Sequence, residues 1–353
     1  MSDKTTHSVR LEPVGLEIEV EEGEWILDAA FRQGLALPHG CREGRCSACK
    51  CVLVDGDVEV EGYSTFALPE YEKDSGQILM CRSKVYSDAT LELLNYDEDM
   101  LSRSIPVTDI AGELTSVTKL THDIRLLTVK LESPLKFWAG QFVELTVPSA
   151  GVTRSYSMGS TPATPNELQF IVRKYPEGVF SSLLDTTLTP GTPVSVKGPF
   201  GSCLRREGRP GPMLLVGGGS GMSPLWSILQ DHIASGEQRP IRFFYGARAR
   251  KDLFFLDEFA AITKSLPDFQ FIPVLSQADP GDEWTGETGF VHEALERVMR
   301  AQNLSGELDA YTCGPVPMVD AVLPVLMDLG VDPHNSHVDK FTPASATSPN
   351  LPH

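Results

Sequence analysis

Four of the seven cysteines follow a spacing that restricts what the first third of the chain can fold around. Four residues separate Cys41 from Cys46, two separate Cys46 from Cys49, and 31 separate Cys49 from Cys81. Three thiolates on one tight loop can wrap an inorganic cluster that a distant fourth thiolate closes, and plant-type 2Fe–2S sites have this spacing. We therefore predict a 2Fe–2S cluster with these four cysteines as its ligands.

Two other interpretations of the cysteine loop are a zinc site and free thiols. Zinc sites more often combine two close cysteines with a second close pair of ligands, so the spacing favours the cluster. Gly40 and Gly44 allow the backbone to come close and direct N–H groups toward sulfur. Because four cysteines suffice, we expect Cys51 to be a packed thiol and His39 a structural histidine.

The net negative charge of the chain limits the kinds of partner that it can bind. The 353 residues carry a formal net charge of −18, and residues 1–100 hold 21 Asp and Glu against 9 Lys and Arg. Nucleic acids and anionic membranes bind clustered Lys and Arg, so we expect neither as a partner. A protein with a basic docking patch fits better. The sequence has no apolar run of the ~18 residues that span a bilayer, and its polar start predicts no signal peptide, hence a cytoplasmic protein.

Three segments with different patterns predict three folding units, as the length allows. In the first, residues 8–20 alternate apolar and polar side chains like a half-buried strand, and a helix over 25–33 and a strand over 50–54 flank the cysteine loop. This is a small α+β unit. From 110 to 204, regular short strands with Gly and Pro turns predict an antiparallel β-barrel.

From residue 213 onward the pattern changes to alternating strands and helices. Such alternation predicts an α/β unit with a parallel sheet. The expected strands are 213–216, 241–245, 269–275 and 310–312, and the expected helices are 222–234, 256–266, 291–301 and 318–329. After residue 341 a low-complexity tail of Thr, Pro, Ala and Ser predicts disorder.

Two stretches of the barrel region carry groups suited to a flavin. An arginine can pair with a pyrophosphate, a tyrosine can pack on a flavin ring, and a serine can hydrogen-bond a ring nitrogen. Each stretch alone is more often a surface turn, but their order and spacing inside a barrel favour flavin binding. The first is Arg154, Ser155, Tyr156 and Ser157, and the second, with a close-approach glycine and hydroxyl donors for phosphate, is Gly178, Val179, Ser181 and Ser182.

A glycine-rich turn follows the first strand of the α/β region and opens a helix. Its N–H groups, with the helix dipole, can hold a pyrophosphate, although such a turn also suits close packing. Arg248 ends the next strand, where a ribose is expected. Arg248 and the basic residues after it can also pair with a 2′-phosphate, so the sequence leaves both NADH and NADPH open as donors. Cys313, Gly314 and Pro315 end a later strand, where the thiol either faces the nicotinamide or lies in the core. The turn itself is Gly217, Gly218, Gly219, Ser220 and Gly221.

With these motifs in this order, the chain resembles the ferredoxin–NADP reductase superfamily, in the subset with an N-terminal plant-type ferredoxin domain. The likeness covers about residues 9–341. More closely, the chain is similar to the reductase components of soluble diiron monooxygenases, especially those that oxidise propane and similar small substrates. The stretches that carry this likeness are 63–69, 93–99, 136–141 and 339–341.

The resemblance implies a function and roles for particular residues. Electrons would pass from NADH through FAD and the 2Fe–2S cluster to a diiron hydroxylase, and the protein would be a monomer. Ser157, Cys313 and Phe341 would lie closest to hydride transfer, with Ser157 near the flavin N5 and Phe341 over the isoalloxazine face. FAD would be held by 154–157 and 178–182, and NADH by 217–221, Arg248 and 313–315.

The resemblance also implies folds and domain boundaries. A β-grasp ferredoxin domain of α+β class would span 1–97, followed by a linker over 98–107. An FAD-binding antiparallel β-barrel would span 108–207, an NAD-binding α/β domain 208–341, and a disordered tail 342–353.

Two other functions are compatible with the same motifs. The reductase of an aromatic-ring-hydroxylating (Rieske) dioxygenase shares every cofactor motif, and its protein acceptor would distinguish it. A redox-sensing or assembly protein would bind the cofactors without turnover, and it would not oxidise NADH with any artificial acceptor.

Overall fold

The structure is a computed structural model that describes residues 5–94, 96, 101, 103–176, 178–279, 281, 283–302, 304 and 306–341. The predicted tail, 342–353, and residues 98–100 and 102 of the predicted linker lie outside these residues. The chain divides into two compact units, one made of Met1–Thr108 with Gly198–Ser202, the other of Asp109–Lys197 with Cys203–His353.

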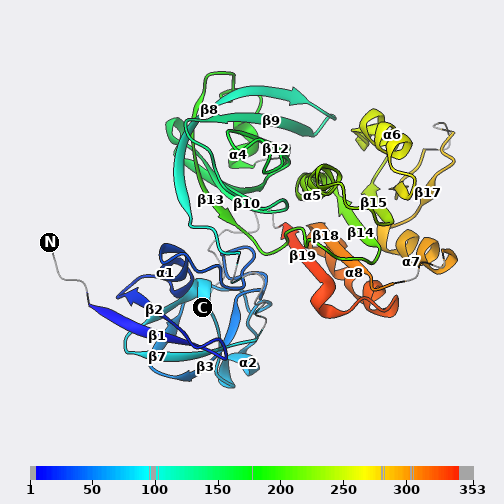
Figure 1. Cartoon of the computed structure of the whole chain (residues 1–353). Helices are drawn as coiled ribbons and strands as arrows, with labels where there is room; N and C mark the ends of the chain where they lie inside the picture. The colour runs from blue at the N-terminus through cyan, green and yellow to red at the C-terminus, as the bar shows by residue number, and fades with distance from the viewer. Residues whose placement is uncertain are drawn as a thin grey trace. The chain divides into compact units, whose positions relative to one another are not determined.

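The first unit is built on a five-stranded sheet in the order β2-β1-β7-β3-β5. Figure 1 labels β1, β2, β3 and β7 of this sheet. Strand β1 pairs antiparallel with β2 and parallel with β7, while β3 pairs antiparallel with β7 and β5. Strands β4 and β6 form a separate small sheet. The elements are β1 (Thr6–Glu12), β2 (Leu16–Glu21), α1 (Ile26–Arg32), β3 (Lys50–Asp55), β4 (Val58–Val60), α2 (Glu70–Asp74), β5 (Gln77–Leu79), β6 (Ser83–Val85) and β7 (Ala89–Leu93).

The prediction of one strand over residues 8–20 is wrong, because this stretch forms the hairpin of β1 and β2. Pro13 to Gly15 make the turn, and Gly15 has φ +66°. Apolar and polar side chains alternate on both sides of the turn, because each of the two strands buries one apolar face. The buried residues are Val9 and Leu11 on β1 and Ile18 and Val20 on β2.

Segment 198–202 completes the first unit from the second half of the chain. Phe200 is 1% exposed, and its ring centroid lies 5.3 Å from that of Phe31 on α1. The guanidinium of Arg42 lies 3.8 Å from the Phe200 ring centroid, within cation–π range. The Ser202 hydroxyl donates to the carbonyl of His39 at 3.0 Å. The core beside the cysteine loop is therefore closed by residues distant in sequence.

The second unit begins with a six-stranded sheet in the order β11-β10-β13-β8-β9-β12. Strand β9 pairs antiparallel with β8 and β12, and β10 pairs antiparallel with β11. Alternate apolar side chains of these strands form one core, which includes Leu127, Val129, Leu145 and Phe170. The elements are β8 (Thr108–Lys119), β9 (Ile124–Leu131), β10 (Phe142–Val147), β11 (Val152–Ser157), β12 (Glu167–Arg173), α4 (Val179–Leu183) and β13 (Pro193–Phe200).

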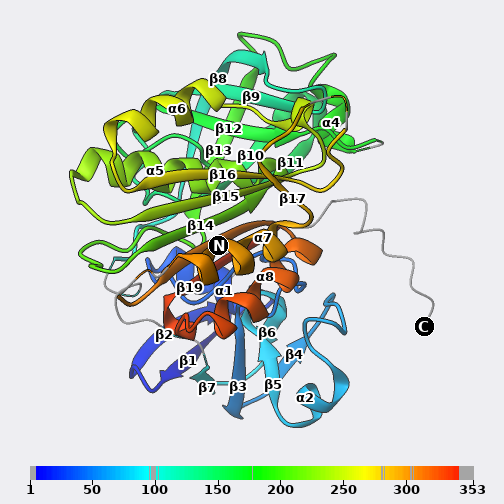
Figure 2. The same cartoon turned by 90° about the vertical axis from the view of Figure 1, so that its right-hand side faces the viewer.

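The predicted parallel sheet is confirmed, with strand order β17-β16-β15-β14-β18-β19. Both faces are covered: Leu215 packs in a core with α5 and α6, and its neighbours Leu214 and Val216 pack in another with α7 and α8 (Figure 2). The elements are β14 (Met213–Gly218), α5 (Met222–Ser235), β15 (Ile241–Ala247), α6 (Leu256–Ser265), β16 (Phe269–Leu275), β17 (Glu287–Thr288), α7 (Val291–Ala301), β18 (Asp309–Pro315), α8 (Val316–Asp328) and β19 (Ser336–Phe341).

In the described part of the chain, every helix is too short or too polar to cross a membrane.

Candidate functional site

The four predicted cluster ligands come together in the first unit. The Sγ atoms of Cys49 and Cys81 lie 3.2 Å apart, and the N–H of Cys41 points at Cys46 Sγ from 3.2 Å. A hydrogen bond from Cys46 lowers the pKa of Cys41 to about 6. Four cysteines brought together in this way can supply the four thiolates that a 2Fe–2S cluster binds.

The backbone of the cysteine loop is shaped around sulfur, as the two glycines predict. N–H groups of Glu43 and Arg45 point at Cys41 Sγ from 3.4 and 3.3 Å. A Cβ on Gly40 would lie 2.9 Å from Cys46 Sγ, and one on Gly44 would lie 2.9 Å from Arg82 Cγ. A side chain at Gly40 would take space that a thiolate needs, and one at Gly44 would collide with Arg82 and Tyr63 and so push the loop away from them. The donor set therefore fits a 2Fe–2S cluster.

His39 and Cys51 have the structural roles that the sequence predicts. His39 is 2% exposed; its Nδ1–H donates to the carbonyl of Leu37 at 2.7 Å, and its Nε2 accepts from the N–H of Gly201 at 2.6 Å. Burial lowers the pKa of His39 to about 4, so the ring is neutral at pH 7. Both ring nitrogens are used, which leaves none to ligate metal. Cys51 is fully buried, and burial raises the pKa of its thiol.

The first flavin stretch forms strand β11. Successive side chains of a strand alternate between faces, so Arg154 and Tyr156 project to one face and Ser155 and Ser157 to the other. The Tyr156 ring packs on Phe180 of α4, with centroids 4.8 Å apart. This contact joins the two stretches that the sequence assigns to FAD.

Ser157 is held by groups that sequence reasoning missed. It is buried, and its hydroxyl donates to Asp339 Oδ2 on β19 at 3.0 Å. Its carbonyl accepts from the hydroxyl of Ser223, in the first turn of α5, at 2.7 Å. One turn later, the hydroxyl of Ser227 donates to the carbonyl of Ser160 at 2.6 Å. The flavin strand is thereby fixed to the helix that follows the glycine turn.

The hydroxyls of the second flavin stretch form hydrogen bonds with nearby backbone groups. Ser181 Oγ accepts from the N–H of Tyr175 at 2.9 Å, and Ser182 Oγ donates to the carbonyl of Val179 at 2.8 Å. A Cβ on Gly178 would lie 2.8 Å from Ser181 Oγ. The glycine therefore permits this tight start of α4, and the role of the stretch in holding a phosphate stays a prediction.

The glycines of the nicotinamide turn have two different roles. A Cβ on Gly221 would lie 2.0 Å from the carbonyl oxygen of Cys313, and one on Gly217 would lie 2.5 Å from Leu225 Cδ1. These two positions are glycine because β18 and α5 pack against them. Gly218 and Gly219 instead line a cavity of about 520 Å³.

This cavity lies where the α/β topology predicts a ligand. From β14 the chain proceeds outward through β15 to β17, then returns to β18 on the other side of β14. In open α/β sheets, ligands bind at the carboxyl ends of the strands where the order reverses in this way. Arg248 and Pro315, which the sequence predicts as ligands, line it together with residues that sequence reasoning missed: Asp123, Arg173, Tyr245, Asp252, Phe290 and His292.

Cys313 and Phe341 lie at different depths. Cys313 is fully buried, its Sγ is 3.6 Å from that of Cys203, and burial raises the pKa of its thiol. The thiol thus lies in the core, one of the two positions that the sequence left open. Phe341 is the half-buried last residue of β19, opposite Pro315. Their roles in hydride transfer stay predictions.

Comparisons with known proteins identify the domains. Family models match three parts of the chain: 2Fe-2S iron-sulfur cluster binding domain at residues 9–86, Oxidoreductase FAD-binding domain at 111–204, and Oxidoreductase NAD-binding domain at 215–323. These matches confirm the predicted 2Fe–2S, FAD and NAD cofactors. They favour the cluster over the zinc site and the free thiols that the cysteine loop also suggested. The proposed domain boundaries stay a prediction.

Similar proteins match the chain over nearly its whole length. The propane 2-monooxygenase reductase component of Mycolicibacterium goodii is 44% identical, over 96% of this chain and 97% of its own. The toluate 1,2-dioxygenase electron transfer component of Pseudomonas putida is 33% identical, over 92% and 94%. The solved structure of Amycolatopsis cytochrome P450 reductase GcoB has a TM-score of 0.84 at 32% identity, over 96% of this chain and 100% of that one. The chain therefore belongs to the ferredoxin–NADP reductase superfamily, among the oxygenase reductase components that join an N-terminal 2Fe–2S domain to FAD- and NAD-binding domains.

Proposed function

We propose that this oxidoreductase supplies electrons from NADH to the hydroxylase of a soluble diiron monooxygenase, one that acts on propane or similarly small substrates, in the cytoplasm. The observation that carries the proposal is the 44% identity to a propane 2-monooxygenase reductase component over 96% of the chain. When bound, FAD accepts hydride and the 2Fe–2S cluster passes on single electrons, so a two-electron donor serves a one-electron acceptor.

Residues of this chain would position the cofactors rather than react with them. Cys41, Cys46, Cys49 and Cys81 would hold the cluster. The hydroxyl of Ser157, fixed by Asp339, would lie near the flavin N5, and 178–182 would hold the flavin pyrophosphate. The bonds from Ser223 to Ser157 in the flavin stretch, and from Ser227 to Ser160 just after it, support close approach of flavin and nicotinamide, because both ligands would then rest on one rigid frame.

Two exposed aromatic side chains, on a segment that contacts the cysteine loop, support docking of a protein acceptor. Phe66 and Tyr71 are 72% and 73% exposed. Their segment contacts the loop: the Ser47 hydroxyl donates to the carbonyl of Ala67 at 2.8 Å, and the N–H of Ser64 donates to the carbonyl of Gly44 at 3.0 Å. Acidic residues are abundant in this unit, so the fitting partner has an apolar centre with a basic rim.

Stopped-flow reduction of candidate acceptors tests the proposal. Under anaerobic conditions, the NADH-reduced protein should reduce a propane-type diiron hydroxylase much faster than a Rieske oxygenase. The double variant Phe66→Ala/Tyr71→Ala should slow that step, and Tyr86→Ala, which removes another exposed aromatic of the same unit, should not. Equal rates with both acceptors would refute the diiron assignment.

The alternative acceptor is the Rieske oxygenase itself. It is favoured by the 33% identity to a toluate 1,2-dioxygenase electron transfer component. Faster reduction of the Rieske protein in the same experiment would establish this second function.

A further inference from the structure

Arg248 is held between two carboxylates at the edge of the nucleotide cavity. Its Nη2 lies 3.2 Å from Asp123 Oδ2, and its Nε lies 3.6 Å from Asp252 Oδ2. Asp123 belongs to the turn between β8 and β9, whereas Asp252 follows β15. The barrel and the α/β sheet thus each contribute one carboxylate to the same guanidinium.

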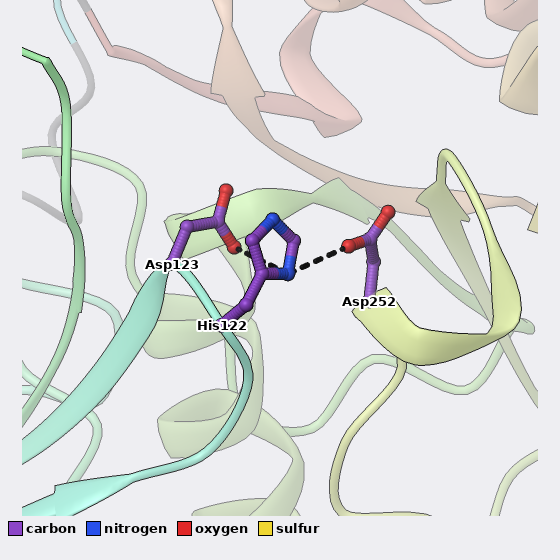
Figure 3. Close-up of side chains that lie close together, drawn as sticks. All are labelled: His122, Asp123 and Asp252. Atoms are coloured by element: carbon purple, nitrogen blue, oxygen red, sulfur yellow. Dashed lines mark ion pairs between the residues drawn. The ribbon is translucent and has the colours of Figure 1, made fainter.

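The surrounding groups keep both carboxylates in place. Asp123 Oδ2 also accepts from Arg173 Nε at 3.0 Å, and its Oδ1 accepts from the Thr121 hydroxyl at 3.0 Å. Burial opposes ionisation of Asp123, but Arg173 and Thr121 outweigh it, so the pKa of this carboxyl is lowered. Asp252 Oδ2 accepts from the N–H of Ala249 at 3.1 Å, and its Oδ1 faces His122 Nδ1 at 3.3 Å (Figure 3).

The position of Arg248 favours NADPH, whereas its two carboxylate partners favour NADH. In dinucleotide folds, the residue after the second strand meets the adenosine ribose, where an acidic residue accepts the 2′-hydroxyl and an arginine accepts a 2′-phosphate. Arg248 alone would therefore favour NADPH. Asp123 and Asp252 offset the positive charges of Arg248 and of Arg173, which also contacts Asp123. The two carboxylates would themselves repel a phosphate that carries about two negative charges.

We propose that Asp123 and Asp252 make this cavity reject the 2′-phosphate by holding Arg248 in a charge-balanced cluster, so that the protein selects NADH over NADPH. This inference rests on the proposed nicotinamide site and adds the residues that set its selectivity. Asp123 is a positioning residue here, since it acts on the dinucleotide through Arg248 and through its own charge.

A divalent cation is the competing explanation of the cluster. Ligand atoms of His122, Asp123 and Asp252 all lie within 4.8 Å of one another. However, two guanidinium groups already contact Asp123 Oδ2, and a cation there would have to displace them or lie beside their positive charges. The observed contacts therefore favour a site organised around arginine.

Steady-state kinetics of the complete holoenzyme with ferricyanide as acceptor test the proposal. Asp123→Asn and Asp252→Asn should each raise the ratio of kcat/KM for NADPH to that for NADH at least about fivefold, the effect of one unit charge at about 4 Å in a water-like dielectric. The gain should appear in KM for NADPH, with kcat unchanged, and Arg248→Ala in the Asp123→Asn background should abolish it. The matched control is Asp185→Asn, which removes an exposed carboxylate that pairs with Arg125 outside the cavity.

Each outcome has one meaning. An unchanged ratio in both aspartate variants, with altered KM for NADH and normal flavin content, would overturn the selectivity proposal while the site stands. Unchanged constants for both nucleotides in every variant, Arg248→Ala included, would overturn the nicotinamide site as well. Loss of NADH affinity on chelation that zinc or magnesium restores would assign the cluster to a metal and overturn the proposal.

Discussion

Gly221→Ala should destabilise the second unit by steric overlap, whether or not nucleotide is bound. The new Cβ would lie 2.0 Å from the carbonyl oxygen of Cys313, 2.6 Å from its carbonyl carbon and 2.9 Å from the Cα of Gly314. Carbon atoms in contact are ordinarily about 3.5–4.0 Å apart, so the overlap is well over an ångström. All three atoms are backbone of β18, which pairs with β14 on one side and β19 on the other.

The expected loss is at least about 3 kcal/mol, the upper end for an overpacked core, because a strand paired on both sides cannot move aside alone. Gly236→Ala is the matched control at the other end of α5. That glycine has φ +74° with open space among the described residues where its Cβ would lie, so only the left-handed backbone conformation is penalised, by about 1 kcal/mol.

Urea unfolding without nucleotide, followed by the fluorescence of released flavin, measures the difference. For a slope of about 3 kcal/mol per molar, Gly221→Ala should lower the midpoint by about 1 M and Gly236→Ala by about a third of that. If Gly221→Ala is no less stable than Gly236→Ala and instead only weakens NADH binding, then this glycine serves the ligand and the packing argument is refuted.

Three further predictions concern the cysteine loop, the end of β19 and the start of β18. Cys46→Ser should abolish transfer to a protein acceptor while NADH-driven ferricyanide reduction survives; loss of both activities would contradict the division between cluster and flavin units. Phe341→Ala should change the KM for nicotinamide nucleotides, and unchanged NADH and NADPH kinetics would remove this residue from the site. Asp309, the first residue of β18, is buried, and its carboxylate lies 3.1 Å from His337 Nε2 and 3.1 Å from Arg239 Nη1. Burial opposes ionisation of Asp309, but His337 and Arg239 outweigh it and lower its pKa, so its stabilising effect is present above about pH 4 and is lost as the pH falls through that lowered pKa. Asp309→Asn should therefore show a smaller change in urea midpoint between pH 5 and pH 3 than the natural chain, and an equal change would contradict the assignment.

The parts of the fold that follow local pattern could be predicted from the sequence. The expected strand 269–275 and helix 291–301 coincide with β16 and α7, because each is a periodic run between clear breakers. The hairpin at 8–20 was missed because both of its strands alternate apolar and polar side chains and so resemble one continuous run. The signal of the turn is the change of the buried positions from odd numbers (Val9 and Leu11) to even numbers (Ile18 and Val20). Strand β19 was missed because Ser336–Phe341 is largely polar and becomes a strand by pairing with β18.

The candidate site divides in the same way. The cluster ligands lie in one motif, so spacing alone is informative. The hydrogen bond from Ser157 to Asp339 joins residues 182 positions apart, and the one from Arg248 to Asp123 spans 125. No local pattern encodes such partners, because they depend on how barrel and sheet pack. The roles of Gly217 and Gly221 were equally out of reach, since only the folded neighbours reveal the missing space.

The contribution of segment 198–202 to the first unit limits how this protein can be divided or recombined. A fragment that ends at Thr108 would contain every cluster cysteine, yet it would leave the Nε2 of His39 without the Gly201 N–H and the Phe31 face without Phe200. An exchange of electron-transfer modules between related reductases would face the same mismatch. A module that can be exchanged needs both pieces of chain, so it is larger than the stretch that carries the cysteines.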